Sequence, residues 1–134
     1  MKLVLDSNVL IAAFATRGIF NSLFEFCLEN HQIIISEFIL NELHCALQKK
    51  IKLPLFSIKK IIKYLREFCI LAEYNKITED IFIDPDDLEI LALAFHNQVK
   101  YIITGDRDLL IIKKFKNIAI LSPRDFWAKQ KKNN

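Results

Sequence analysis

The stretch MKLVLDSNVLIAAF, residues 1–14, contains a short apolar run that stops at a carboxylate. Lys2–Leu5 is too short for a helix and is typical of a buried strand, whereas Asn8–Phe14 reads as a helix. A buried ionised carboxylate is costly unless something compensates it. Asp6 therefore either caps the following helix from a hydrated strand end or holds a metal ion.

Strand-like and helix-like segments alternate along the rest of the chain. Further strands are expected in HQIIIS (31–36), FCILAE (68–73), YIIT (101–104) and NIAIL (117–121). Helices are expected over Asn21–Glu29, after the cap Ser36, along an apolar stripe from Ile58 to Phe68, in DPDDLEILALAFHNQ (84–98), and after Ser122-Pro123. This alternation predicts an α/β fold whose mainly parallel sheet has helices on both faces.

Composition narrows the class of protein. The 134 residues, of which 52% are hydrophobic, suit a single domain with a sizeable core, and a net charge of +3 neither requires nor excludes a nucleic-acid partner. We expect one domain over residues 1–128 and a flexible basic tail, KQKKNN, over 129–134. No membrane span or signal peptide is expected, and Cys27, Cys45 and Cys69 are expected to be buried thiols in a reducing cytoplasm.

Acidic residues stand where elements end or begin. Asp6 and Asp106 each follow an apolar strand, Asp87 stands at a helix start, and Glu42 lies in an otherwise apolar helix. The carboxyl ends of parallel strands meet at one edge of a sheet, so these acids are expected to converge there. Converging carboxylates repel one another unless a cation intervenes, and oxygen ligands suit Mg²⁺ or Mn²⁺. Taken singly, each acid is also explained as a cap or a solvated residue.

Four segments together resemble a known family. LVLDSNVLIAAF, SEFILNEL, DPDDLEILALAF and YIITGDRDLL occur in the order of the PIN-domain nucleases, over about residues 2 to 125. They most resemble the toxin-type, VapC-like group of toxin–antitoxin pairs. The resemblance implies a PIN-like three-layer α/β/α sandwich with a mainly parallel sheet of four to five strands.

The resemblance also implies a site. Its four acids would be Asp6, Glu42, Asp87 and Asp106, around one or two Mg²⁺ or Mn²⁺ ions. The accessory positions would be Ser7, Asn8 and Thr104, with Asp84 and Asp86 as outer-shell or capping residues, and Asp108 as an accessory acid or a helix-start residue. The implied activity is metal-dependent hydrolysis of single-stranded RNA, with a 3′-hydroxyl as the leaving group.

RNA and protein partners follow from the same resemblance. Positive charge for RNA would come from Arg107, from Lys59, Lys63 and Arg66, and from the lysines at 49, 50 and 52, although surface lysines also serve solubility. Base stacking is a role for Phe14, Phe20 and Tyr64, with core packing as the alternative. The family implies an antitoxin partner and a homodimer, and the apolar stripe containing Phe20, Leu23, Phe24 and Phe38 is a candidate partner surface.

Two alternatives stay open at this point. One is a PIN-type nuclease in RNA processing or structured-DNA cleavage, which would use identical chemistry. The other is a non-enzymatic, receiver-like α/β module with acids at strand ends. The chain has no lysine directly after NIAIL, as a receiver domain would need, and no glycine-rich turn for a dinucleotide.

Overall fold

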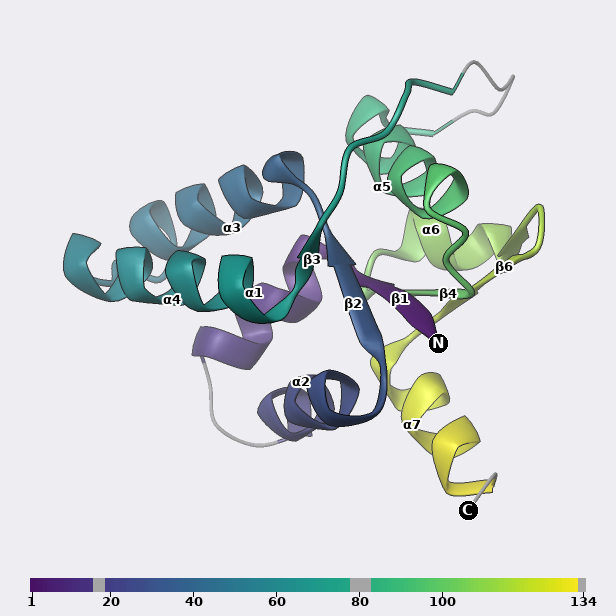
Figure 1. The fold of residues 1–134 in the computed structure, drawn as a ribbon, viewed down its shortest axis with the longest axis horizontal. Helices are drawn as coiled ribbons and strands as arrows, with labels where there is room; N and C mark the ends of the chain where they lie inside the picture. Colours follow the sequence, from purple (N-terminus) through teal and green to yellow (C-terminus); the bar gives the residue numbers. More distant parts are fainter. Residues whose placement is uncertain (16–18, 78–82, 133–134) are drawn as a thin grey trace.

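The protein folds around one twisted sheet (Figure 1). The computed structural model describes residues 1–15, 19–77 and 83–132. Within these residues the strands are β1 (Lys2–Leu5), β2 (Gln32–Ile35), β3 (Ile70–Leu71), β4 (Tyr101–Ile103), β5 (Lys114–Phe115) and β6 (Ile118–Leu121). Their order across the sheet is β3-β2-β1-β4-β6-β5, and all neighbouring pairs are parallel except the antiparallel β5–β6 pair.

Helices cover both faces of this sheet. They are α1 (Ser7–Ala15), α2 (Ile19–Asn30), α3 (Glu37–Lys49), α4 (Leu55–Phe68), α5 (Pro85–His96), α6 (Arg107–Ile112) and α7 (Pro123–Lys132). In Figure 1, α5 and α6 lie on one side of the strands and α2 and α7 on the other, while α3 and α4 extend from the β3–β2 edge. The predicted three-layer α/β/α sandwich is confirmed.

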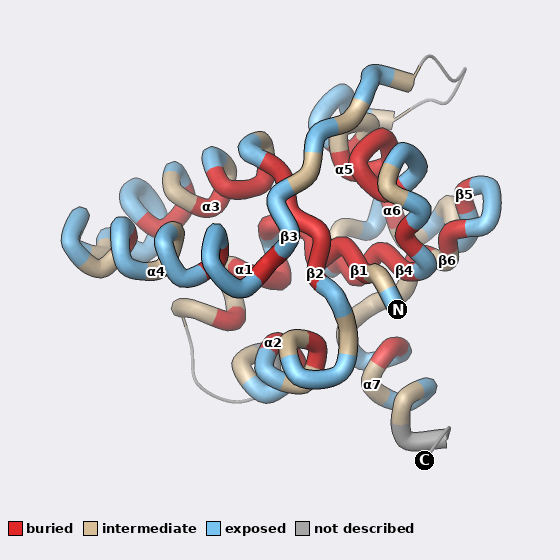
Figure 2. Tube along the Cα trace, in the orientation of Figure 1, coloured by how far each residue is buried: buried red, intermediate tan, exposed pale blue. Residues whose placement is uncertain are grey.

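The central strands are buried along nearly their whole length (Figure 2). Leu3, Val4 and Leu5 of β1 and the three residues of β4 all lie in the core. Strands covered on both faces need continuous apolar sequences, which explains why these segments show no polar alternation. The outward turns of α4 are exposed in the same view.

Strand register brings the ends of β1 and β4 together. Leu5 pairs with Ile103, and the backbone N–H of Asp6 donates to the Ile103 carbonyl at 2.9 Å. The residues that follow the two strands, Asp6 and Thr104, are therefore neighbours although 98 positions separate them in sequence. Caps fix two helices at this edge, because the Ser36 hydroxyl accepts the Ile39 N–H and Asp84 precedes Pro85 at the first position of α5.

Some expectations are corrected by the structure. The sheet of the described residues has six strands rather than four or five, because β5 is a two-residue strand too short to produce a sequence pattern. Cys45 is exposed, unlike the buried Cys27 and Cys69, because it lies on the outer face of α3. Phe68 is also exposed, so the apolar stripe of α4 ends before it.

The carboxyl terminus differs from the expected loose tail in part. Helix α7 continues through Lys132, so four of the six residues of KQKKNN are helical, and residues 133 and 134 lie outside the described residues. Residues 16–18, between the helices expected over Asn8–Phe14 and Asn21–Glu29, also lie outside the described residues. No helix among the described residues is long and apolar enough to cross a membrane.

Several sharp turns are made without glycine. Lys52, Gln98, Lys113 and Lys116 have φ values of 61°, 55°, 63° and 55°. Side chains disfavour this left-handed region because Cβ crowds the backbone. A chain with two glycines in 134 residues makes these turns with long polar side chains instead.

Candidate active site

A small acidic cavity lies at the carboxyl edge of the sheet. Its volume is about 160 Å³. The described residues that line it are Asp6, Ser7, Asn8, Glu42, Asp84, Asp86, Asp87, Ile90 and Asp106. The four acids expected to converge, Asp6, Glu42, Asp87 and Asp106, thus all face one space although they come from different elements.

Asp6 is buried and held by three hydrogen-bond donors. Its Oδ1 accepts the Ser7 backbone N–H at 2.7 Å, and its Oδ2 accepts the Asn8 amide at 3.1 Å and the Thr104 hydroxyl at 2.8 Å. The polar residues that follow β1 and β4 therefore fix the orientation of this carboxylate. Asp6 accepts a hydrogen bond at the start of α1 and also lines the cavity. The role of helix cap that the sequence suggests is therefore compatible with the role of metal ligand.

The other walls are tied to the same residues. The Ser7 hydroxyl donates to Glu42 at 3.1 Å, which links the start of α1 to α3. The backbone N–H of Asp106 donates to the Thr104 hydroxyl at 3.0 Å, so Thr104 contacts two of the acidic positions. Ser7 and Thr104 therefore set the relative positions of three carboxylates.

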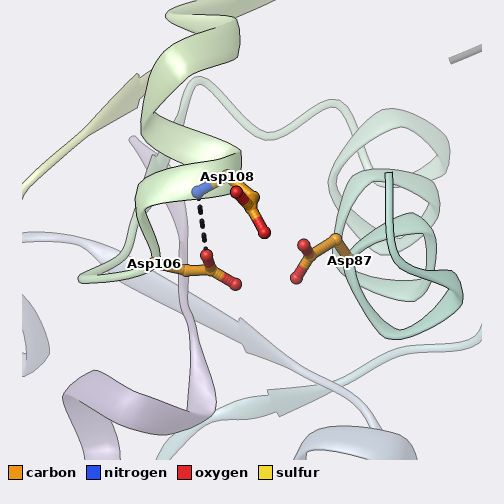
Figure 3. A group of neighbouring side chains, drawn as sticks. All are labelled: Asp87, Asp106 and Asp108. Atoms are coloured by element: carbon orange, nitrogen blue, oxygen red, sulfur yellow. Dashed lines mark hydrogen bonds between the residues drawn. The ribbon is translucent and has the colours of Figure 1, made fainter. Parts of the chain in front are cut away.

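Asp87 is the unusual member of the group. It is 7% exposed, and its buried Oδ2 has no hydrogen-bond partner among the described residues. One carboxylate oxygen of Asp87 lies within 4.8 Å of one oxygen each of Asp106 and Asp108. Figure 3 shows Asp87 of α5 facing Asp106, which precedes α6, and Asp108 in its first turn. A buried carboxylate that has one oxygen without a donor and faces further carboxylates is costly unless a cation binds there.

The pKa values of these acids reflect the burial and crowding of the carboxylates. Burial, and then the negative charge of Asp106, raise the pKa of Asp87 to about 7. Burial is also the main cause that raises the pKa values of Asp6 and Glu42, and hydrogen bonds from Thr104 and Ser7 oppose it. Without a cation, the folded chain therefore keeps protons on these groups to higher pH than the unfolded chain does.

A pH-dependent stability follows for the metal-free protein. Because the pKa of Asp87 is raised from 3.8 to about 7 on folding, the unfolded state ionises first, and the free energy of unfolding falls as the pH rises from 3.8 to about 7. Asp87→Asn should therefore stabilise the protein in EDTA at pH 7.5 by on the order of 2–4 kcal/mol, and by much less at pH 4.5. Urea unfolding of both proteins at the two pH values measures this difference.

The exposed Asp125 in the first turn of α7 provides the control. Asp125→Asn should change the free energy of unfolding by less than about 1 kcal/mol at each pH. Equal stability of Asp87→Asn and the original protein at pH 7.5 in EDTA would show that the negative charge of Asp87 does not destabilise the folded protein.

The comparisons with known proteins agree with this geometry. The family model described as PIN domain matches residues 2–108, which include every acid of the cavity. The chain belongs to the PIN domain family. This membership excludes the receiver-like alternative. PIN domains are nucleases that use divalent metal ions.

A solved structure shares the fold of this PIN domain. It is VapBC2 from Rickettsia felis, bound to a DNA fragment from its promoter, with 18% sequence identity and a TM-score of 0.66. The match covers 91% of this chain and 98% of the other. Curated protein sequences give no match. At this level of identity the structural likeness supports the PIN fold alone.

The remaining predicted site residues divide into those near the cavity and those away from it. Asp84 accepts the Asp86 N–H as the cap of α5, and both of these exposed acids line the cavity. Asp108 lies in the first turn of α6 and donates its backbone N–H to Asp106, so it is both a helix-start residue and part of the acidic group. Arg107 is exposed at the start of α6, next to Asp106.

The basic residues of α4 do not line the acidic cavity. Lys59, Lys63 and Arg66 line a separate groove with His44, and Arg66 is paired with Glu37 at 2.5 Å. Sequence spacing places them on one helix face but does not show which groove that face borders. Glu37 is 29 positions from Arg66, so the pair was not expected.

The aromatic residues also separate. Phe14 and Tyr64 pack against Phe24 in one aromatic cluster, and Leu23 and Phe24 are buried in the core, so neither of these two forms an open partner surface. The side chain of Phe20 lies outside the described residues. One contact near the site was missed from sequence, the hydrogen bond from the Tyr74 hydroxyl to Glu89 of α5, because no local pattern marks it.

Proposed function

We propose that this PIN domain is a divalent-metal-dependent endoribonuclease that cleaves single-stranded RNA. The observation that carries the proposal is the Asp87 carboxylate, which lies beside Asp106 and Asp108 in a cavity also lined by Asp6 and Glu42. The buried Oδ2 of Asp87 has no hydrogen-bond partner among the described residues. Family membership supports phosphodiester hydrolysis as the reaction. Among the described residues that line the cavity, the one hydroxyl side chain, Ser7, has no histidine beside it to activate it as a nucleophile.

The donor set fits a hard divalent cation. The acidic residues Asp6, Glu42, Asp87 and Asp106 present carboxylate oxygens, and neither histidine nor cysteine lines the described part of the cavity. This chemistry suits Mg²⁺ or Mn²⁺ and disfavours zinc, and we propose these four residues as the ligands. Asp108 is an additional candidate because its carboxylate belongs to the same group.

Polar residues beside the cavity would hold the metal ligands in fixed orientations. A bound divalent ion supplies Lewis-acid chemistry and cancels the negative charge that would otherwise repel a phosphate. Ser7, Asn8 and Thr104 hold Asp6 in one orientation through their hydrogen bonds, and Ser7 also holds Glu42. A ligand set fixed before binding needs little rearrangement, which favours precise positioning of the phosphate.

We also propose that the nuclease is the toxin of a toxin–antitoxin pair, with an antitoxin protein as its partner and a homodimer as its working form. The shared fold with VapBC2 from Rickettsia felis supports this choice over an RNA-processing or structured-DNA nuclease. Coexpression with the protein of the neighbouring reading frame tests it. Growth arrest that the neighbour relieves is the expected result, and no arrest together with cleavage of branched DNA would favour the alternative.

Metal dependence has a direct test. Purified protein in EDTA should leave a fluorescence-quenched single-stranded RNA intact, and excess Mn²⁺ or Mg²⁺ should restore cleavage, because the acids repel an unneutralised phosphate. The increase of fluorescence with time measures the rate. Each ion should also raise the melting temperature by preferential binding to the folded state. Cleavage in EDTA at the rate seen with ions would contradict the proposal.

A further inference from the structure

An open groove lies along α3 beside the acidic cavity. Its volume is about 370 Å³, and the described residues that line it include Phe38, Asn41, Glu42, Cys45, Lys49 and Lys50. Glu42 also lines the acidic cavity, so the two spaces adjoin at this residue. The cavity alone, at about 160 Å³, is less than half as large as the groove.

Helical spacing sets the order of these side chains. Phe38, Glu42, Cys45 and Lys49 follow one another at steps of four, three and four residues, so they share one face of α3. Lys49 is seven residues after Glu42, which corresponds to about 10 Å along the helix axis. The groove thus runs from a carboxylate of the acidic cavity, past apolar surface, to two exposed ammonium groups.

Positive charge is concentrated on this part of the chain. Residues 37–68 contain seven Lys or Arg and three Glu, a net charge of +4, whereas the rest of the chain has twelve basic and thirteen acidic residues, a net charge of −1. Arg66 is paired with Glu37, whereas Lys49 and Lys50 are exposed and have no acidic partner among the described residues. A phosphodiester chain that leaves the acidic cavity along the α3 groove therefore meets the positive charge of Lys49 and Lys50 there.

We infer that the α3 groove binds the nucleotide adjacent to the scissile phosphate of a single-stranded RNA. The inference rests on the proposed ribonuclease function. Phe38 and the neighbouring apolar surface offer a face for the base, Asn41 offers an amide for its polar edge, and Lys49 and Lys50 offer charge for the next phosphate. The mixture of an apolar floor with terminal ammonium groups suits a base and its phosphate better than it suits an apolar peptide.

Charge reversal tests the groove. Lys49→Glu/Lys50→Glu should raise the KM for a single-stranded RNA oligomer by about 10-fold or more and flatten its salt dependence, because two phosphate contacts are lost. The melting-temperature increase caused by Mn²⁺ should stay unchanged. The matched control is Lys113→Glu/Lys114→Glu, two adjacent exposed lysines before and in β5, away from the groove, with an expected KM within about 2-fold of the original.

A second measurement needs no substitution. Cys45 lies in the groove and is exposed, whereas Cys27 and Cys69 are buried and burial raises the pKa of both thiols to about 12. A benzophenone maleimide should therefore react with Cys45 in the folded protein. Irradiation with a radiolabelled RNA oligomer and Mn²⁺, immediately after mixing, should give a covalent RNA adduct, and addition of unlabelled RNA should reduce it.

The outcomes are distinguishable. An unchanged KM in the reversed variant, together with no adduct, would overturn the groove assignment while leaving ribonuclease activity intact. Charge reversal that spares RNA cleavage but prevents inhibition by an antitoxin would also overturn it and assign the groove to a protein. Failure of the original protein to cleave RNA with Mn²⁺ would instead remove the proposed function and, with it, this inference.

Discussion

Asp6→Asn is expected to lower the rate of Mn²⁺-dependent RNA cleavage by about 10²–10³-fold or more. The substitution preserves size but removes the negative charge that a divalent ion requires. It also turns one oxygen into an amide donor, and both oxygens of Asp6 now accept hydrogen bonds from Ser7, Asn8 and Thr104. One of these contacts must therefore be lost, so both the charge and the orientation of the ligand change. Single-turnover cleavage with saturating Mn²⁺ measures the effect.

The matched control for this prediction is Asp84→Asn. Asp84 lines the same cavity and undergoes the same chemical change, but it is exposed, and asparagine is an equally good helix cap. Its cleavage rate should fall by less than about 10-fold. A rate for Asp6→Asn equal to that of the original protein, with Asp84→Asn strongly impaired, would place the reaction on the outer acids. Circular dichroism of each variant excludes unfolding as the cause.

Phe126→Ala is expected to lower the free energy of unfolding by about 3–5 kcal/mol. Phe126 of α7 is 0% exposed and packs edge-on against Tyr101 of β4 and His31, with ring centroids 5.9 and 6.0 Å apart. Removing the ring leaves a cavity between the last helix and the sheet. Urea denaturation followed by circular dichroism measures the loss.

This prediction also concerns the extent of the domain. The PIN family model matches residues only up to 108, yet α7 begins at Pro123 and its aromatic side chain fills the core. We propose that α7 belongs to the same cooperative unit. Phe56→Ala, at a residue 69% exposed, should cost little and serves as the control. A loss below about 1 kcal/mol for Phe126→Ala would mean that α7 docks on a domain that is stable without it.

The sequence was sufficient to predict the parts of the fold that long patterns determine. The apolar runs of β1, β2 and β4, the cap at Ser36 and the stripe of α4 each span several residues that agree with one another. Strand β5 was not expected, because a segment of two residues between α6 and β6 has no pattern to detect. Helix α6 was expected only as one of two alternative roles for Asp108. These elements form through tertiary contacts with β6.

The site was predictable only where chain topology determines position. Asp6 and Asp106 follow parallel strands, so a common edge could be expected, and the structure places them on one cavity. Their roles as metal ligands stay a prediction. Side-chain surroundings were less accessible to sequence reasoning, because the direction in which a helix face points depends on its neighbours. Cys45 is exposed and Lys59 and Lys63 border a second groove for this reason.

The left-handed turns have a consequence for the history and engineering of this molecule. Gln98 precedes β4 and Lys116 lies between β5 and β6, so both turns are at the end of the sheet opposite the acids. Each side chain in that conformation is unfavourable by about 1–2 kcal/mol. The chain thus tolerates local conformational cost far from its chemistry. Substitution of these residues by glycine should raise the free energy of unfolding. The added stability would then offset destabilising substitutions around the acids.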